Sequence, residues 1–257
     1  MDTGLSGRTA IVPGSTAGIG RAVAEALAAE GMNVVVAGRR EPLAREVAAS
    51  LPSAVGVQAD LTTAAGTEAV VAAATTHFGR VDVLVLNGGG PPPGRAVDVD
   101  AEAAQQAVQL LLLPHVRLVQ AVLPAMREAG WGRIVAVGSS GVQQPLDRLA
   151  ASNVGRAALA GYLKTLATEV AADGVTVNMV LPGRIDTDRV AALDRAAAER
   201  AGTTTGDARR RVEETIPVGR YGRPQEFAAV VTFLASAAAS YVTGAQVRCD
   251  GGLVRSH

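Results

Sequence analysis

The sequence is short of the residue types that mark several classes of protein. Its 257 residues include one cysteine, Cys249, so the chain cannot close an internal disulfide. Its three histidines and single cysteine show no spacing typical of metal ligands, and we predict no metal site. The 24 basic and 24 acidic side chains cancel, which argues against nucleic acid or an anionic membrane as a partner.

Long apolar runs are also missing. Runs such as LVQAVLPAM are far shorter than the roughly 20 residues that cross a bilayer. The opening segment, MDTGLSGRTA, has no charged region followed by an apolar one, which is the pattern of a secretory signal. We therefore expect a soluble, cytoplasmic protein without a membrane partner.

The chain does have a regular alternation of short β-branched runs and alanine-rich helical segments. Strands are predicted at 9–13, 33–37, 54–58, 81–86, 133–138, 175–181 and 245–249, with helices beginning near 18, 41, 64, 101, 150 and 224. Each crossover must return the chain to the same sheet, so the pattern predicts an α/β fold. We expect a Rossmann-like, doubly wound parallel sheet of about seven strands with helices on both faces, forming one domain over residues 1–257.

A polar helical stretch interrupts this alternation at about 188–215. It lies between a strand end and the last large helix, and it is rich in alanine, arginine and acidic residues. Such a segment beside a cleft is typical of a mobile lid, and we predict that role here.

Three glycines follow the first predicted strand in the stretch PGSTAGIG. Gly14, Gly18 and Gly20 stand where a strand gives way to a helix. Glycine at these positions lets backbone N–H groups approach a pyrophosphate, and the helix N-terminus adds a partial positive charge. Taken alone, the same glycines would also fit an ordinary tight turn, but their position after the first strand favours a dinucleotide.

The end of the second predicted strand bears on which dinucleotide binds. An acidic residue there would hold the ribose 2′-hydroxyl of NAD, but the sequence AGRR has Gly38 followed by Arg39. A guanidinium can hold a 2′-phosphate by charge-assisted hydrogen bonds, so NADP(H) is favoured over NAD(H). The alternative is that Arg39 and Arg40 are simply solvated loop residues.

Together these motifs resemble the short-chain dehydrogenase/reductase family over nearly the whole chain. The resemblance extends to ADL at Asp60, LNGGG around Asn87, GRIVAVGSS, VNMVLPGRIDTD and the closing PVGRYGRPQEFAAVVTFLAS. The chain is similar to a divergent group that resembles 3-oxoacyl-[acyl-carrier-protein] reductases. The resemblance implies an NAD(P)(H)-dependent oxidoreductase that interconverts ketones and alcohols, acting on a small molecule as a homo-oligomer, either a tetramer or a dimer.

The resemblance also implies the residues that contact the cofactor. They are Gly14, Ser15, Gly18, Ile19, Gly20, Arg39, Asp60, Leu61, Asn87, Gly88, Pro182, Gly183, Ile185 and Thr187. Two departures fall in this half of the chain: Pro13 replaces the usual threonine of the first turn, and Leu86 replaces the first asparagine of an Asn-Asn-Ala-Gly stretch.

The family's usual catalytic set is Asn, Ser, Tyr and Lys, and here only the serine, Ser139, stands in its place. By position, Ser152 replaces the tyrosine, Arg156 the lysine and Leu111 the asparagine. Residues i and i+4 share a helix face, so Arg156 can reach what the lysine would reach. A serine is a poor acid and an arginine keeps its proton, so neither repeats the tyrosine's proton transfer.

We therefore expect Ser139, together with Arg156 or Ser152, to stabilise a developing alkoxide while water or another group supplies the proton. Two alternatives stay open. The fold could carry a non-redox elimination or isomerisation with Asp147 or His115 as base, or it could be a catalytically silent nucleotide-binding partner subunit.

Overall fold

The computed structural model describes residues 2–255 and contains one parallel sheet of seven strands. The strand order is β3-β2-β1-β4-β5-β6-β7, and every neighbouring pair is parallel. The strands are β1 (Thr9–Pro13), β2 (Asn33–Gly38), β3 (Ala54–Gln58), β4 (Val83–Leu86), β5 (Gly132–Val137), β6 (Val175–Pro182) and β7 (Gln246–Cys249). The predicted fold class is confirmed, and strand ends differ from the prediction by no more than a few residues.

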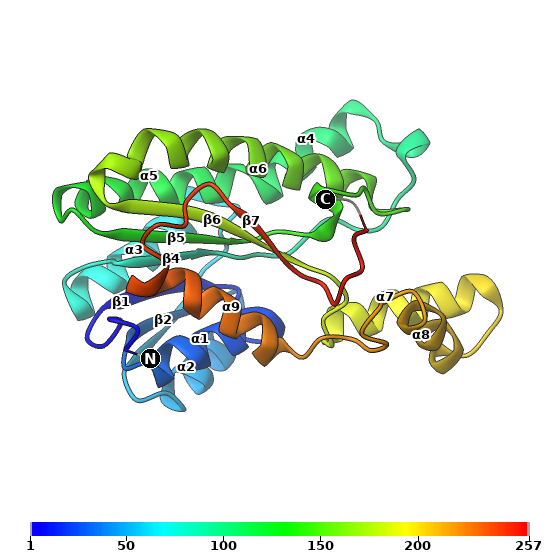
Figure 1. Ribbon diagram of the computed structural model, residues 1–257, viewed down its shortest axis with the longest axis horizontal. Coiled ribbons are helices and arrows are strands. Elements are labelled where there is room, and N and C mark those ends of the chain that lie inside the picture. The colour runs from blue at the N-terminus through cyan, green and yellow to red at the C-terminus, as the bar shows by residue number, and fades with distance from the viewer. Residues whose placement is uncertain (1, 256–257) are drawn as a thin grey trace.

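Helices cover both faces of the sheet (Figure 1). One layer holds α1 (Gly18–Ala29), α2 (Glu41–Ala49) and α9 (Pro224–Ala235). The other holds α3 (Ala64–Phe78), α4 (Ala101–Leu111), α5 (Leu113–Glu128) and α6 (Ala150–Val170). Alternate side chains of a strand enter the two cores: on β1, Val12 packs in the first layer and Ile11 in the second.

The long helix predicted from about 101 is in fact two helices. The chain turns at Leu112, whose φ and ψ of −117° and −59° depart from helical geometry, and α5 then begins with Pro114 in its first turn. Proline suits a helix start because its missing N–H has no intrahelical partner there in any case. Pro114 is a local signal for such a boundary, which the prediction of one long helix did not take into account.

The stretch Ala101–Glu128 is long and apolar enough to cross a membrane by length and composition alone, and 39% of its most apolar segment is buried inside the structure. In the fold, α4 packs against α6 and α5 packs against α3. Both helices thus belong to the layer that covers the second face of the sheet.

The order of the strands creates a crevice at one edge. β1 pairs with β2 on one side, Ile11 beside Val35, and with β4 on the other, Ile11 beside Leu84. The connections after β1 and β4 therefore leave in opposite directions, which opens a crevice at the carboxyl ends of the strands.

The segment predicted as a lid forms two helices, α7 (Asp188–Ala201) and α8 (Thr205–Glu213). They pack against each other and extend away from the sheet beyond its carboxyl edge (Figure 1). The chain then returns through 214–223 to α9. The mobility of this lid stays a prediction.

Candidate active site

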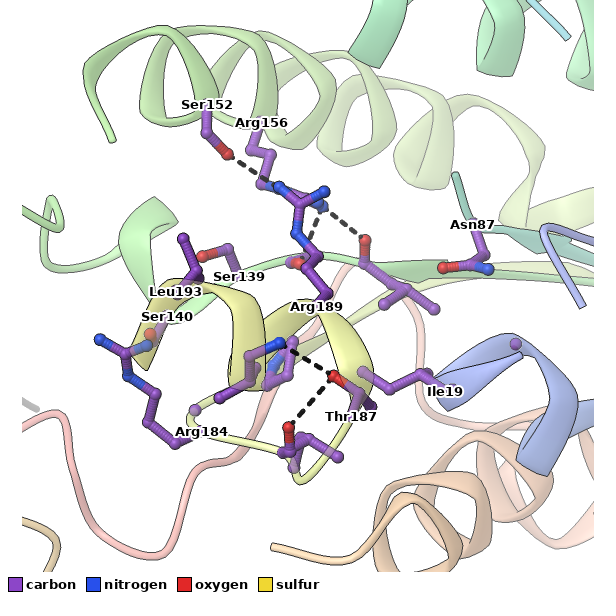
Figure 2. Close-up of a pocket in the computed structure, with 18 of the residues that line it drawn as sticks. Ile19, Asn87, Ser139, Ser140, Ser152, Arg156, Arg184, Thr187, Arg189 and Leu193 are labelled. Carbon is purple, nitrogen blue, oxygen red and sulfur yellow. Dashed lines mark hydrogen bonds between the residues drawn. The ribbon is translucent and has the colours of Figure 1, made fainter. Parts of the chain in front are cut away.

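A cleft of about 300 Å³ lies at the carboxyl edge of the sheet. Figure 2 shows the first turn of α1 on one side, α6 and the loop after β5 on another, and the first turns of α7 facing them. The predicted residues that line it are Gly14, Gly18, Ile19, Gly20, Asn87, Gly88, Ser139, Ser152, Arg156, Pro182, Gly183, Ile185 and Thr187. The fold therefore brings most of the predicted site together.

The turn after β1 is tight, and its glycines are required by geometry. Gly14 and Gly18 have φ of +61° and +57°, where a side chain is strained. A Cβ on Gly20 would lie 2.3 Å from the carbonyl oxygen of Gly14, closer than any real contact. The Asn87 side chain donates from Nδ2 to the carbonyl oxygen of Pro13 at 2.9 Å and ties the turn to the end of β4.

The N-terminus of α1 has no side chain to satisfy its first N–H groups. Its N-cap, Ala17, makes no side-chain hydrogen bond, and the first turn has no acidic residue. These N–H groups and the positive end of the helix dipole border the cleft, an arrangement that binds phosphate. The residues present therefore fit the pyrophosphate of a dinucleotide. Thr187 closes over this turn, since its Cγ2 lies 3.3 Å from where a Cβ on Gly18 would stand.

Four predicted cofactor residues lie outside the cleft, and two of them, Ser15 and Leu61, have side chains that pack inside the protein. Ser15 is fully buried, and its hydroxyl donates to the carbonyl oxygen of Val12 while accepting from the N–H of Ala37. Its side chain holds the turn to β2 and does not face a ligand. Leu61 packs against the apolar core on the α3 side of the sheet.

Arg39 and Asp60 line a second hollow where β2 and β3 end. Hydrogen bonds from the Thr62 side chain and backbone, with the charge of Arg39, hold the pKa of Asp60 below its ordinary value. At the end of β2, a Cβ on Gly38 would lie 2.7 Å from Cγ2 of Thr16. This packing leaves no room for an acidic side chain at position 38 unless Thr16 moves.

Ser139 is placed to donate a hydrogen bond into the cleft. Its Oγ accepts from the N–H of Gly141 at 3.0 Å, which fixes the side chain at the start of the short turn after β5. Within residues 2–255 the hydroxyl hydrogen has no acceptor, so it is free to point at a substrate oxygen in the cleft.

Arg156 and Ser152 lie together on the face of α6 that borders the cleft. Arg156 donates from Nη1 to the carbonyl oxygens of Val137 and Gly138, both at 2.9 Å, and from Nε to Ser152 Oγ at 3.4 Å. The sequence prediction that the two residues share a face is thus confirmed. Burial, with the charge of Arg189, lowers the pKa of Arg156 to about 10, so the guanidinium is a cation at neutral pH.

The sequence reasoning missed the residues that α7 contributes. Asp188, Arg189, Val190 and Leu193 all line the cleft. Thr187 caps α7 by accepting from the N–H of Val190 at 3.4 Å, which fixes the first turn of the helix over the cleft. The Thr-Asp pair is a local signal for a helix start, but which face of that helix meets the cleft depends on the tertiary fold.

Leu146, Leu149 and Leu253, also unpredicted, add apolar surface to the wall of the cleft. Among residues 2–255 the lining includes no tyrosine, lysine, histidine or cysteine. Tyr162 packs against the core on the α3 side of the sheet and does not line the cleft.

Asp147 and His115, the candidate bases, lie outside the lining of the cleft. Asp147 is exposed, and the N-cap of α6 is Leu149, so this carboxylate does not cap the helix. His115 is 4% exposed beneath Gly88, with Cε1 3.9 Å from where a Gly88 Cβ would stand, and its Nδ1 has no partner within residues 2–255. Burial, with the charge of Arg156, lowers the pKa of His115 to about 4, so the ring is neutral at pH 7.

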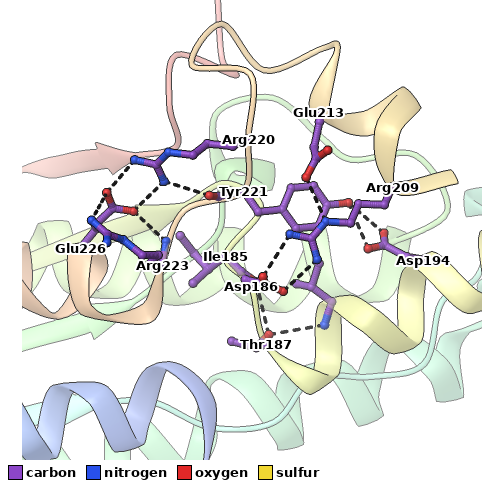
Figure 3. Close-up of polar contacts among 11 residues, drawn as sticks. Ile185, Asp186, Thr187, Asp194, Arg209, Glu213, Arg220, Tyr221, Arg223 and Glu226 are labelled. Atoms are coloured by element: carbon purple, nitrogen blue, oxygen red, sulfur yellow. Dashed lines mark hydrogen bonds and ion pairs between the residues drawn. The ribbon is translucent and has the colours of Figure 1, made fainter. Parts of the chain in front are cut away.

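A polar cluster fastens the base of the lid to the loop before α9 (Figure 3). Tyr221 is buried and donates its hydroxyl to the Asp194 carboxylate of α7, with both oxygens at 3.0 Å. Arg209 of α8 stacks over the Tyr221 ring at 4.4 Å and pairs with Asp186 at 3.0 Å and Glu213 at 2.9 Å. Burial, with the Asp194 charge, raises the pKa of Tyr221, so this phenol stays protonated.

In the part of the chain that the structure describes, no three His, Cys, Asp or Glu side chains form a group that could hold a metal ion.

Comparison with known proteins agrees with this geometry. Residues 14–254 match a family model, adh_short_C2, described as Enoyl-(Acyl carrier protein) reductase. The chain is 35% identical over 252 residues to the 3-oxoacyl-[acyl-carrier-protein] reductase FabG of Salmonella typhimurium, covering 97% of this chain and 98% of that protein.

Two solved structures are also similar. The L-sorbose reductase of Gluconobacter frateurii, complexed with NADPH and L-sorbose, superposes with a TM-score of 0.94 at 34% identity and full coverage of both chains. YwfH, an NADPH-dependent reductase involved in bacilysin biosynthesis, superposes with a TM-score of 0.90 at 27% identity, covering 97% of this chain and 99% of that one. By its sequence, its sheet and its glycine turn, the chain belongs to the short-chain dehydrogenase/reductase family.

Proposed function

We propose that the protein is an NADP(H)-dependent oxidoreductase that interconverts a ketone and an alcohol at an atypical site. One observation carries the proposal: a single cleft joins the uncapped N-terminus of α1 to the free hydroxyl of Ser139 and the cation of Arg156. Bound along this cleft, NADPH would supply the hydride. The similar L-sorbose reductase is described with NADPH, which supports this cofactor.

The end of β2 supports a preference for NADP(H) over NAD(H). The acidic residue that would bind a ribose 2′-hydroxyl is absent, and Thr16 occupies the space that its side chain would need. Arg39 borders the second hollow, where its guanidinium can form charge-assisted hydrogen bonds to a 2′-phosphate.

We infer that Ser152 and Arg156 stand where most relatives have tyrosine and lysine, and that electrostatic stabilisation replaces the tyrosine's proton transfer. As hydride reaches the carbonyl carbon, the oxygen gains negative charge. Ser139 donates its free hydroxyl hydrogen to that oxygen, and Arg156, held by two carbonyl groups of the β5 end, places a positive charge nearby. A solvent water then supplies the proton, so the product is the alcohol.

Activity against a panel of ketones and aldehydes, followed by NADPH absorbance, tests the proposal. Loss of one hydrogen-bond donor to such an oxyanion lowers kcat by about 10²- to 10³-fold, and Ser139→Ala should show this loss. Ser240→Ala is the matched control, because Ser240 is exposed and remote from the cleft. Activity that survives Ser139→Ala would refute the role of this serine.

A gain of function tests the atypical site. The double substitution Ser152→Tyr with Arg156→Lys restores the family's usual pair on the same helix face. We expect reduction to become faster, up to the roughly 10²- to 10⁴-fold that a positioned general acid contributes. An unchanged or lower rate in a folded variant would mean that the cleft is not aligned for hydride transfer.

The absence of a tyrosine, lysine or histidine from the lining, within residues 2–255, favours one alternative, a catalytically silent subunit that binds the nucleotide. Tight NADPH binding without turnover of any carbonyl compound would support that alternative. A non-redox reaction has less support, since Asp147 and His115 lie outside the lining.

We also propose a cytoplasmic homo-oligomer, a tetramer or a dimer, assembled through α5 and α6. These helices present Leu113 at 37% exposure and Val154 at 45%. Sedimentation analysis tests this assembly, and Val154→Glu should weaken it.

A further inference from the structure

The charged side chains that line the cleft do not balance. Arg156, Arg184 and Arg189 carry positive charge, and Asp188 is the one acidic residue among the described lining residues. Arg184 has a distant partner, with Nη1 4.0 Å from the Asp194 carboxylate. Within residues 2–255, Arg156 and Arg189 form no ion pair with a carboxylate.

Arg189 rises from the first turn of α7 toward Arg156 (Figure 2). Its guanidinium lies against the backbone at Gly90, where an added Cβ would be 2.5 Å from Nη2. Although Arg189 as a residue is exposed, burial of its charged end lowers its pKa, and its charge in turn lowers the pKa of Arg156. Two interacting like charges in a partly desolvated cleft are unfavourable, and an anion between them reverses the sign of the interaction.

The position of this pair separates it from the phosphate-binding turn. Arg156 is fixed to the carbonyl groups of Val137 and Gly138 at the end of β5, beside the catalytic candidates Ser139 and Ser152. In Figure 2, Ile19 marks the α1 turn on the opposite side of the cleft from Ser152. The pair therefore lies at the end of the cleft where the carbonyl compound would react.

We infer that Arg156 and Arg189 together bind the anionic group of the substrate, so that the substrates are oxo acids with a carboxylate close to the carbonyl. This inference rests on the proposed function and names its substrate class. A guanidinium pair suits a carboxylate: Arg189 can donate two parallel hydrogen bonds from its fork, and Arg156, whose Nη1 and Nε already donate to Val137, Gly138 and Ser152, keeps the two hydrogens of Nη2 for the same group. Leu146, Leu149 and Leu193 border the same end and would contact an apolar substituent.

The test uses phenylglyoxylate, an aryl 2-oxo acid, and its uncharged methyl ester as matched probes. Each is titrated into NADPH-loaded protein, and the dissociation constant is measured from the fluorescence of bound NADPH. The acid should bind about tenfold or more tightly than the ester, as expected for charge-assisted hydrogen bonds. Equal affinity for the two probes would overturn the inference.

Three variants test whether Arg189 causes the preference for the acid over the ester. Arg189→Gln should abolish the preference for the acid, and Arg189→Lys should keep part of it. Gly90→Ala should also weaken acid binding, because the new Cβ displaces the flexible end of Arg189 without changing its charge. Arg195→Gln is the control: it lies exposed on the same helix and does not line the cleft.

The same titrations distinguish the substrate's anionic group from the phosphates of the cofactor. If Arg189 serves the substrate, Arg189→Gln leaves the NADPH dissociation constant within about twofold and changes only acid binding. If NADPH binding weakens instead and the acid-to-ester ratio is unchanged, the inference is wrong although the proposed function stands. If the wild type binds no NADPH, the proposed function fails, and calorimetry of the cofactor-free protein with phenylglyoxylate then decides the inference by the same Arg189→Gln comparison.

Discussion

His115 makes the stability of this protein depend on pH in a way that can be calculated. The ring is 4% exposed, and burial, with the charge of Arg156, lowers its pKa from 6.5 to about 4. In the unfolded chain the ring protonates below about pH 6.5. Between pH 6.5 and 4 the unfolded state therefore binds a proton that the native state does not, and the free energy of unfolding falls as the pH falls.

The size of the effect follows from the difference between the two pKa values. One pKa unit corresponds to about 1.4 kcal/mol, and a difference of about 2.5 units gives a loss of about 3 kcal/mol between pH 7 and pH 4. The His115 contribution is fully present above pH 6.5. Carboxylates with lowered pKa values, such as Asp60, lose stability in acid as well, so the histidine must be isolated by substitution.

His115→Leu provides that isolation, because leucine fits a buried site and has no proton to gain. Urea unfolding at pH 7, 6, 5 and 4, at one protein concentration, can be followed by the fluorescence of the single tryptophan, Trp131. The wild type should lose about 3 kcal/mol more than the variant over this range. Parallel curves for the two proteins would show that His115 is not buried as a neutral ring.

Three further substitutions test other parts of the structure. Arg39→Ala should weaken NADPH binding by about 10- to 100-fold while leaving NADH binding unchanged, and an equal loss for both cofactors would exclude a 2′-phosphate contact. Tyr221→Phe leaves the buried Asp194 carboxylate without its phenol donor. The free energy of unfolding in urea should fall by about 1–3 kcal/mol, and amide hydrogen exchange should become faster in α7. Unchanged exchange would show that this contact does not hold α7 in place. Gly20→Ala places a Cβ 2.3 Å from the Gly14 carbonyl oxygen and should abolish NADPH binding in a chain whose circular dichroism is still native; retained binding would contradict the turn geometry.

Much of the fold follows from local pattern. The runs of β-branched residues predicted the seven-stranded parallel sheet. The glycine spacing predicted that Gly14, Gly18 and Gly20 lie at the N-terminus of the first helix. The helical spacing of Ser152 and Arg156 predicted their shared face because i and i+4 lie one turn apart. These features depend on neighbours in the sequence, which is why the sequence reveals them.

Other features depend on contacts between distant segments. Ser15 lies outside the cleft because its hydroxyl bonds to β1 and β2. Arg189 reaches Gly90 only through the way α7 lies over the sheet edge. Spacing within the chain gives no indication of that approach, and so the pair with Arg156 emerged from the structure alone.

The central proposal is that the cleft holds NADP(H) although its described lining has no tyrosine or lysine. Calorimetric titration of the purified protein with NADPH tests it most directly. We predict saturable heat at one NADPH per chain, weaker binding of NADH, and no binding to Gly20→Ala. Flat heats with NADPH for the folded wild type would contradict the account.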